Sequence, residues 1–296
     1  MLRTLRRQMW LLPVAVLLVA LPASASDGAV LRIGIVADIH AHDTDSPLEG
    51  KYMSHTAERL TAFTDAMNTW PADLIIELGD FVNGWVILGA DPGDPGRIPD
   101  LLEWADSLLA QFHGPRYHVI GNHDVYNLDK TQYRERLGLD ATFYSFDAGA
   151  FHFVVLDVQF DVGGRDLAHT YTGVAGAVPT EELEWLRDDL AATDRPTIVC
   201  VHQPLDSDVP EWGRPLVSNA PEVRRVLAES GVVIAVFQGH EHANRAAQID
   251  GIHYVTFEAL VDQGTAPSWA HVTLDASQRT IEIVGVGEQV DRLLGF

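Results

Sequence analysis

The sequence predicts a single α/β domain whose strands are covered on both faces by helices. Short apolar runs rich in β-branched residues recur along the 296 residues. Segments with helical spacing of apolar residues lie between the earlier runs. The runs themselves are almost continuously apolar, which is typical of parallel sheets that crossover helices bury on both faces.

The predicted strands are these apolar runs, which begin with LRIGIVAD and end with TIEIVGVG. In order they cover residues 31–38, 73–80, 117–124, 151–158, 197–204, 232–240, 253–260, 271–275 and 280–287. The last three runs follow one another without a helical segment. We therefore expect them to form an antiparallel edge.

Four segments carry apolar residues at helical intervals. They are Tyr52–Trp70, Leu101–Phe112, Glu181–Leu190 and Glu222–Glu229. In the first segment Leu60, Phe63 and Met67 share one face. Thr180 is predicted to cap the third helix, and Pro221 stands near the start of the fourth, where proline is tolerated.

No internal repeat and no linker in the sequence marks a domain boundary. The one conspicuous irregular stretch, Gly89–Pro99, is predicted to be a long loop. The only cysteine, Cys200, lies inside the apolar run TIVCV and is expected to be a small buried hydrophobic residue. Without an internal disulfide, the fold depends on its apolar core.

Residues 1–25 have the layout of a secretory signal peptide. Three arginines form a basic start, Met9–Leu21 is an apolar run too short for a spanning anchor, and Ala25 ends a small-residue cleavage site. The expected mature domain, 26–296, is exported to the periplasm or the extracellular space by the general or the twin-arginine route. An uncleaved membrane anchor is the alternative, and a lipid anchor is not expected, because no cysteine lies near the cut.

The composition is strongly acidic, with a formal net charge of −22 at pH 7. Such a surface disfavours nucleic acids and anionic membranes as partners, and it indicates no oligomeric state. Lysine is scarce, with only Lys51 and Lys130. A small phosphorylated substrate would therefore need a local positive charge, which a metal cluster would supply.

Candidate metal ligands appear where the predicted strands end. Binding sites in open α/β sheets form outside the carboxyl ends of the strands, so side chains from separate strand ends meet there. The candidate ligands are Asp38, His40, Asp80, Asn122, His202, His240 and His242. Residues two positions apart, such as Asp38 and His40, point the same way from an extended chain.

These oxygen and imidazole donors, with no thiolate among them, suit manganese, iron, zinc, cobalt or nickel. They are too many for one tetrahedral ion, but they suffice for two ions that share one carboxylate. Paired ions clamp the attacking and leaving oxygens of a phosphoryl displacement. The sequence therefore predicts a centre of two divalent transition-metal ions.

In their order along the chain the motifs resemble those of the calcineurin-like metallophosphoesterases. They are Asp38-x-His40, Gly79-Asp80-x-x-Asn83, Gly121-Asn122-His123-Asp124, His202 and Gly239-His240-x-His242. The resemblance implies a four-layer αββα sandwich with the dimetal centre at the sheet edge. One ion is then held by Asp38, His40 and His242. The other is held by Asn122, His202 and His240, with Asp80 as the bridge.

His123 is expected to lie beside the metal cluster without being a ligand. It would contact the phosphate and stabilise charge or protonate the leaving oxygen, while a hydroxide that bridges the ions attacks phosphorus in line. Asp124 would orient the imidazole of His123, as a carboxylate does in a catalytic triad.

The candidate substrate-binding residues are Asn83, Tyr126 and Tyr144. Asn83 has the motif position that supports the centre or touches phosphate. The two tyrosines, together with Trp85, are candidates to stack a base or line the mouth of the site.

The second half of the chain resembles the manganese-dependent ADP-ribose/CDP-alcohol diphosphatases more closely. This resemblance rests on GNHDVYN, FYSF, TEELEWL, GIHYVTFEALVD and the ending GVGEQVDRLL. The sequence departs from that subfamily at His40, where Gln is usual, at VHQPL, where SHLPI is usual, and in its export signal. The implied function is cleavage of phosphodiester or pyrophosphate bonds in small nucleotide-like substrates, with manganese as the expected metal. A phosphomonoesterase on the same centre and a catalytically silent metal-binding protein are the alternatives.

Overall fold

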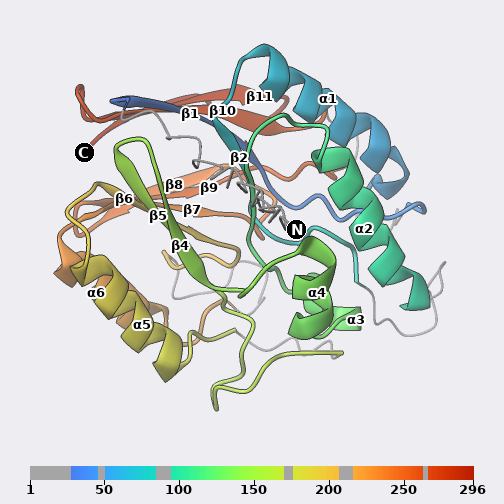
Figure 1. The fold of residues 1–296 in the computed structure, drawn as a ribbon, viewed down its shortest axis with the longest axis horizontal. Coiled ribbons are helices and arrows are strands. Elements are labelled where there is room, and N and C mark those ends of the chain that lie inside the picture. Colours follow the sequence, from blue (N-terminus) through green and yellow to red (C-terminus); the bar gives the residue numbers. More distant parts are fainter. Residues whose placement is uncertain (1–27, 46–50, 85–94, 170–175, 207–215, 263–265) are drawn as a thin grey trace, which may run out of the picture.

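Two mixed β-sheets stack face to face and carry helices on their outer faces (Figure 1). The computed structural model describes residues 28–45, 51–84, 95–169, 176–206, 216–262 and 266–296. The expected signal peptide, Trp85 and most of the expected loop Gly89–Pro99 lie outside these residues. The layers confirm the predicted αββα sandwich and the single domain.

The first sheet combines strands from both ends of the chain in the order β12-β11-β10-β1-β2-β3. The bounds are β1 Val30–Val36, β2 Leu74–Glu77, β3 Arg116–His118, β10 Trp269–Asp275, β11 Thr280–Val286 and β12 Arg292–Gly295. β1, β2 and β3 are parallel, whereas β10, β11 and β12 pair antiparallel. The carboxyl ends of β1, β2 and β3 therefore meet at one edge.

The second sheet has the order β4-β5-β6-β7-β9-β8. The bounds are β4 Tyr144–Ala148, β5 Phe151–Val155, β6 Thr197–Val201, β7 Val233–Gln238, β8 Arg245–Ile249 and β9 Ile252–Thr256. Its four central strands are parallel, and the two edge strands, β4 and β8, are antiparallel to their neighbours. This sheet also presents its parallel carboxyl ends at one edge.

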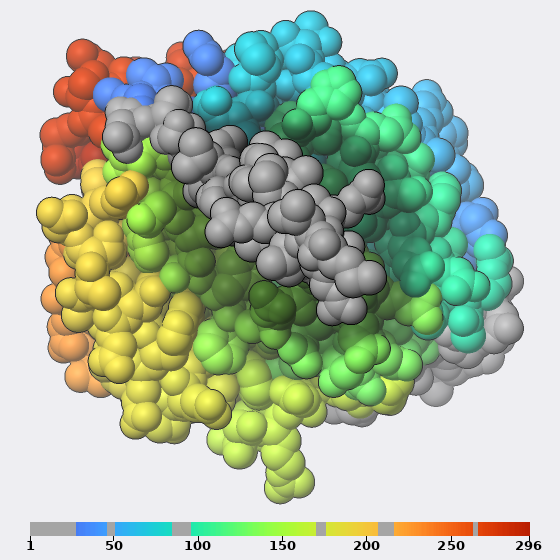
Figure 2. Space-filling model, in the orientation of Figure 1, coloured from blue at the N-terminus to red at the C-terminus, as the bar shows by residue number. Residues whose placement is uncertain are grey.

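Helices pack on the two outer faces of the sandwich. The bounds are α1 Thr56–Thr69, α2 Ile98–Leu109, α3 Asp124–Asn127, α4 Lys130–Leu137, α5 Thr180–Ala191 and α6 Ala220–Ser230, with 3₁₀ helices η1 Met53–His55 and η2 Pro95–Arg97. The α1–α2 side and the α5–α6 side form opposite flanks of the molecule (Figure 2). None of the helices in the described residues is long and apolar enough to cross a membrane.

Three apolar cores separate the four layers. The core between the sheets contains Ile33, Phe153 and Phe237. A second core joins the first sheet to α1, α2 and α4, and a third joins the other sheet to α5 and α6. The prediction that helices cover both faces of the strands is therefore wrong: each sheet has helices on one face only, because the other sheet covers its second face. Cys200 lies buried and free in the central core, as predicted.

The predicted helices are confirmed, but some of their ends differ. α2 begins at Ile98, inside the expected loop, and ends at Leu109, so Phe112 lies beyond it. Thr180 is the first residue of α5 and not its N-cap, because Pro179 holds that position and no side chain caps the helix. Pro221 lies in the first turn of α6, as predicted.

The predicted antiparallel edge is wrong in one strand. β9 belongs to the second sheet, parallel to β7, whereas β10 and β11 belong to the first. Three edge strands, β4, β8 and β12, were not predicted. β8 shows why: it alternates partly buried with exposed residues, so it contains no apolar run.

His152 on β5 ties the β4–β5 hairpin to α5. Its Nδ1 lies 2.7 Å from Asp147 Oδ1 on β4, and its Nε2 lies 2.9 Å from Asp189 Oδ2 on α5. The Ser145 hydroxyl donates to the other oxygen of Asp189 at 2.6 Å. Hydrogen bonding to Asp189, and then to Asp147, raises the pKa of His152 above its ordinary value despite burial.

This network predicts pH-dependent stability. Because the folded state holds the His152 proton more tightly than the unfolded chain, the stabilisation is complete below a pH of about 6.5, the ordinary histidine pKa, and is lost as pH rises through the raised value. We expect urea unfolding to show a stability difference between wild type and His152→Gln that shrinks across that window. His271→Gln is the control, since burial lowers the pKa of His271 and the trend should reverse. A difference for His152→Gln that is constant with pH would contradict the assignment.

Candidate metal centre

The predicted ligands lie just beyond the carboxyl ends of strands in both sheets. Asp38 and His40 follow β1, Asp80 follows β2, and Asn122 follows β3. His202 follows β6, and the two histidines of the Gly239 motif follow β7. The backbone N–H of His240 donates to both carboxylate oxygens of Asp38, at 3.1 and 3.0 Å, so this contact joins the two sheets at the edge.

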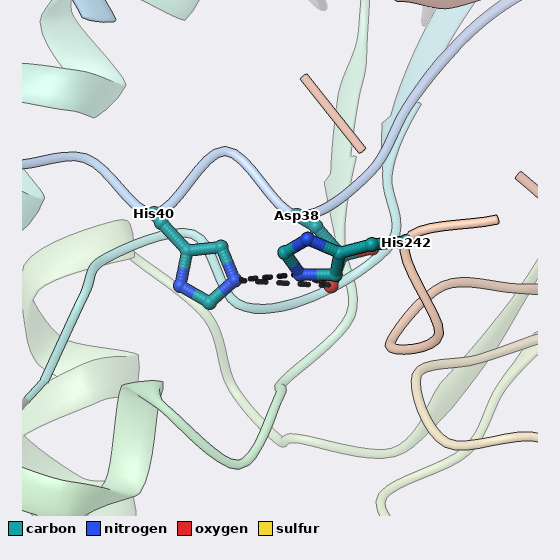
Figure 3. Close-up of side chains that lie close together, drawn as sticks. All are labelled: Asp38, His40 and His242. Carbon is teal, nitrogen blue, oxygen red and sulfur yellow. Dashed lines mark hydrogen bonds and ion pairs between the residues drawn. The ribbon is translucent and has the colours of Figure 1, made fainter. Parts of the chain in front are cut away.

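One group of ligands consists of Asp38, His40 and His242, whose side chains converge (Figure 3). The Nε2 atoms of His40 and His242 are 3.1 Å apart. Asp38 Oδ1 lies 3.4 Å from His242 Nε2 and 4.0 Å from His40 Nε2. These three atoms can face a single cation.

The second group consists of Asp80, His202 and His240. Asp80 Oδ2 lies 3.2 Å from His202 Nε2, and it also lies 3.6 Å from His40 Nε2 in the first group. One carboxylate oxygen therefore faces both groups. This is the arrangement that a bridging ligand requires.

The side chain of Asn122 gives the clearest indication that this site is built to hold a cation. Its Nδ2 donates to the Tyr126 hydroxyl at 2.8 Å. Among the described residues, its buried Oδ1 has no hydrogen-bond partner, and the buried Nε2 of His202 faces only the Asp80 carboxylate, at 3.2 Å. Buried polar atoms are normally satisfied, and a bound cation would satisfy an amide oxygen and an imidazole lone pair. The residues present therefore fit two metal ions.

Three of the ligand histidines have an acceptor beside Nδ1. The partners are Asn83 Oδ1 at 2.9 Å from His40, Asp262 Oδ1 at 2.6 Å from His242, and the Leu78 carbonyl at 2.8 Å from His202. A proton held on Nδ1 leaves the Nε2 lone pair for a metal. These outer contacts therefore aim Nε2 of each ring at the centre.

Five of the ligands adopt a left-handed backbone conformation. The residues with positive φ are Asp38, His40, Asp80, His240 and His242, with φ between 45° and 72°. Non-glycine residues seldom adopt this conformation, although Asp and His tolerate it better than most. Such conformations cluster at functional sites, where the surrounding structure holds them in place.

Two motif glycines are required by close packing around the ligands. A Cβ on Gly121 would collide with the backbone N and side-chain Oδ1 of Asp80. A Cβ on Gly79, whose φ is +96°, would lie 2.5 Å from Nδ1 of His202. Any larger residue at either position would displace a ligand.

The carboxylates give the centre a negative local potential. Burial alone would lower the pKa of His202, but the Asp80 carboxylate raises it to about 9. Burial is likewise outweighed at His242, where Asp38 and Asp262 raise the pKa to about 9. At these two rings the carboxylates therefore favour positive charge, which bound cations would supply, whereas burial and then Lys51 lower the pKa values of His40 and His123.

His123 lies beside the two groups. Its Nε2 is 4.0 Å from Asp80 Oδ2, and its ring centroid is 4.5 Å from that of His40. Its side chain is 14% exposed, whereas His40 and His202 are fully buried. His123 is therefore the most solvent-accessible of these three rings.

The structure assigns Asp124 a role that differs from the prediction. Its two carboxylate oxygens accept the backbone N–H groups of Val82 and Gly121, at 2.9 and 2.8 Å. The Nδ1 of His123 instead lies 3.2 Å from the Gly84 carbonyl. Asp124 thus holds the two ligand loops together, and a backbone carbonyl, not Asp124, orients the imidazole.

The three predicted substrate-binding residues occupy different places. Tyr126 lies at the centre, with its ring centroid 4.6 Å from that of His123. Asn83 is buried against His40. Tyr144 lies elsewhere, since its hydroxyl donates to the His118 carbonyl and accepts from the His118 N–H, at 2.9 and 3.1 Å. Tyr144 therefore supports β3, and the structure does not bring it to the ligands.

Sequence reasoning missed two residues that contact the ligands through their side chains. Asp262 lies in the segment EALVD after β9, where a carboxylate following an apolar strand was the available signal. Lys51 has its Nζ 3.2 Å from His40 Nδ1. The scarcity of lysine in this acidic chain was the only sequence feature that pointed to a role for this residue.

The stacked sheets and the two joined ligand groups define a dimetal hydrolase. Residues 31–244 match the family model described as Calcineurin-like phosphoesterase, and the chain belongs to that family of metal-dependent hydrolases. The match confirms the predicted superfamily.

Individual relatives agree with this assignment. A manganese-dependent ADP-ribose/CDP-alcohol diphosphatase of Oryza sativa subsp. japonica is 24% identical over 287 residues, which cover 81% of this chain and 86% of the relative. A probable cyclic nucleotide phosphodiesterase of Synechococcus sp. is 25% identical over 264 residues, covering 88% and 90% of the two chains. The solved structure of a dimetal phosphatase from Danio rerio superposes with a TM-score of 0.72 at 19% identity, covering 90% of this chain and 99% of that one.

The bridging position of Asp80 makes a direct prediction. Asp80→Ala should abolish the binding of both ions, because Oδ2 of this residue faces both ligand groups. Manganese stoichiometry, measured by metal analysis after reconstitution, should be two for the wild type and for Asp65→Ala, an exposed control on α1. Retention of two ions by Asp80→Ala would contradict the bridging role.

Proposed function

We propose that the protein is an exported, manganese-stimulated hydrolase that cleaves a pyrophosphate or phosphodiester bond in small nucleotide-like substrates of the ADP-ribose or CDP-alcohol type. The observation that carries the proposal is the joining of two ligand groups through Asp80 Oδ2. The name of the rice relative supports both the metal and the substrate class.

One set of residues would hold the metal ions, and another set would contact the substrate. Asp38, His40 and His242 would hold one ion, Asn122, His202 and His240 the other, with Asp80 between them. Two bound cations supply a nucleophile from water at neutral pH and offset the charge that develops on the phosphoryl oxygens.

His123 is positioned to contact the phosphate. The Gly84 carbonyl accepts from Nδ1–H of this ring, so Nε2 faces the centre. Once Nε2 is also protonated, the ring can stabilise charge on the phosphate or pass that Nε2 proton to the leaving oxygen. Tyr126, tied to Asn122 and close to His123, offers an aromatic surface to a base.

Two observations bear on substrate size. The net charge of −22 repels long polyanions over most of the surface. The positive charge that overcomes this field would be confined to the metal centre. A small nucleotide-like anion fits such a site better than a nucleic acid does.

A phosphodiesterase that acts on a cyclic nucleotide is the second candidate, and the similarity to the cyanobacterial relative favours it. A phosphomonoesterase would use the same ligands. A catalytically silent protein fits less well, because silent versions would be expected to lose the bridge or the histidine, and Asp80 and His123 are both in place.

Product analysis tests the substrate class. We expect protein reconstituted with manganese to convert ADP-ribose to AMP, or a CDP-alcohol to CMP, because a pyrophosphatase yields two phosphomonoesters. Cyclic nucleotides and simple monoesters are tested in parallel. Release of inorganic phosphate from monoesters, without cleavage of any pyrophosphate or diester, would leave the family assignment intact and refute the proposed substrate.

The role of His123 is tested separately. His123→Ala should retain two manganese ions and lose turnover by on the order of 10²–10⁴-fold, the usual contribution of proton transfer. The loss should be smaller on a substrate whose leaving group needs no proton, such as a nitrophenyl ester. Near wild-type turnover on a poor leaving group would refute the proton-transfer role.

Export is tested at the N-terminus. We expect a mature chain that begins at Ser26 and lies outside the cytoplasm, because residues 1–25 have the composition of a signal peptide. N-terminal sequencing of the protein from fractionated cells provides the measurement. Full-length protein that begins at Met1 in the soluble cytosolic fraction would contradict the proposal.

A further inference from the structure

Lys51 is a buried cation beside a ligand of the metal centre. Its side-chain Nζ lies 3.2 Å from His40 Nδ1 and 3.2 Å from Asn83 Oδ1. Asn83 Oδ1 is in turn 2.9 Å from His40 Nδ1. The residue is only 7% exposed, in a chain that contains one other lysine. Burying a charged side chain beside a site meant for cations requires a specific reason.

The tautomer of His40 gives that reason. For Nε2 to face a cation, the proton of the neutral ring must be on Nδ1, and an acceptor must receive it. Asn83 Oδ1 is that acceptor. A hydrogen bond from Lys51 to Nδ1 itself would place the ring proton on Nε2 and block ligation. The productive arrangement therefore directs both donors, His40 and Lys51, at Asn83 Oδ1.

An amide side chain can face its neighbours with either its oxygen or its NH₂ group. An ammonium group donates and cannot accept, so Lys51 favours the orientation in which Oδ1 faces inward. The reversed amide would place NH₂ against two donors, with no acceptor for the His40 proton. Lys51 thus selects the orientation of Asn83 that His40 needs.

The backbone of Lys51 is fixed by the segment that supports the other histidine of the same group. Lys51 forms an antiparallel bridge with Asp262, and Tyr52 N–H donates to the Val261 carbonyl at 3.0 Å. Asp262 Oδ1 contacts Nδ1 of His242 at 2.6 Å. One backbone pairing therefore supplies outer contacts to both histidines drawn in Figure 3.

We propose that Lys51 is a positioning residue of the metal centre, which acts through Asn83 to hold His40 in the tautomer that offers Nε2 to a cation. The inference rests on the dimetal centre of the proposed function.

Manganese titration of Lys51→Met, followed by calorimetry and by electron paramagnetic resonance, tests the role. Positioning predicts that affinity for one of the two ions falls by roughly 10–100-fold, as for other outer contacts of metal ligands. A purely electrostatic role predicts the opposite sign, because removing a nearby positive charge would tighten cation binding. Unchanged or tighter binding of both ions would overturn the proposal.

The other lysine provides a matched control. Lys130 is also 7% exposed, and it pairs with Asp157 and Asp166 at 2.7 and 2.9 Å, in contacts that involve none of the ligands. Lys130→Met should lower the melting temperature of chelator-treated protein and leave manganese affinity unchanged. If Lys130→Met lost affinity as Lys51→Met does, general destabilisation would explain the effect and the proposal would fall.

Two further variants test the pathway through Asn83. Asn83→Ala alone and Asn83→Ala combined with Lys51→Met should bind manganese equally, because two residues that act as one unit are not additive. Lys51→Arg, whose guanidinium also only donates, should keep most of the affinity. A further loss in the double variant would overturn action through Asn83. Wild-type protein that bound fewer than two ions would instead refute the dimetal centre itself, and the proposed function with it.

Discussion

The carboxylate of Asp80 fixes the relation between the two ligand groups. Its Oδ1 accepts the backbone N–H of His123 at 2.7 Å, which anchors the side chain to the loop after β3. The other oxygen is then held 3.2 Å from His202 Nε2 and 3.6 Å from His40 Nε2. Gly121 allows this approach, because a Cβ there would occupy the place of Asp80. Loops from both sheets therefore depend on one side chain.

The loops that carry the ligands adopt conformations that a free chain would avoid. A non-glycine residue with a left-handed backbone is strained by about 1–3 kcal/mol, and five ligands have this conformation. Contacts between the loops hold them: Asp38 N–H donates to the Gly79 carbonyl at 3.1 Å, and His40 N–H donates to the Asp80 carbonyl at 2.8 Å. The three apolar cores beneath supply the stability that makes these conformations sustainable. Contacts between the loops therefore hold the strained ligand residues in place.

The sequence was sufficient for those parts of the molecule that local patterns encode. Apolar runs located the central strands, and polar residues at their ends located the candidate ligands that the structure brings together. Edge strand β8 was not predicted, because its residues alternate in burial and form no apolar run. β9 was predicted in the wrong sheet, because the local sequence of a strand does not indicate which strand it pairs with. Contacts made across long sequence separations were equally invisible, as for Asp262 beside His242 and Gly84 beside His123. Asp124 shows the same limit: its neighbour in sequence is His123, but in space its oxygens bind Val82 and Gly121.

The acidity of the chain would also decide the order in which metal ions and a phosphorylated substrate bind at the centre. A net charge of −22 repels a phosphorylated substrate, but at physiological ionic strength this repulsion is screened over about 8 Å. The charges nearest the phosphate therefore decide its binding. Without cations, those charges include the carboxylates of Asp38, Asp80 and Asp262, which draw protons onto His202 and His242. The same carboxylates that attract metal ions would repel a phosphate. Under the proposed function, cations would therefore bind first, and the substrate would then meet a positive centre inside an otherwise negative surface. Metal binding at this centre would thus serve substrate capture as well as chemistry, and the contacts that hold His40 and His242 in place would matter to both.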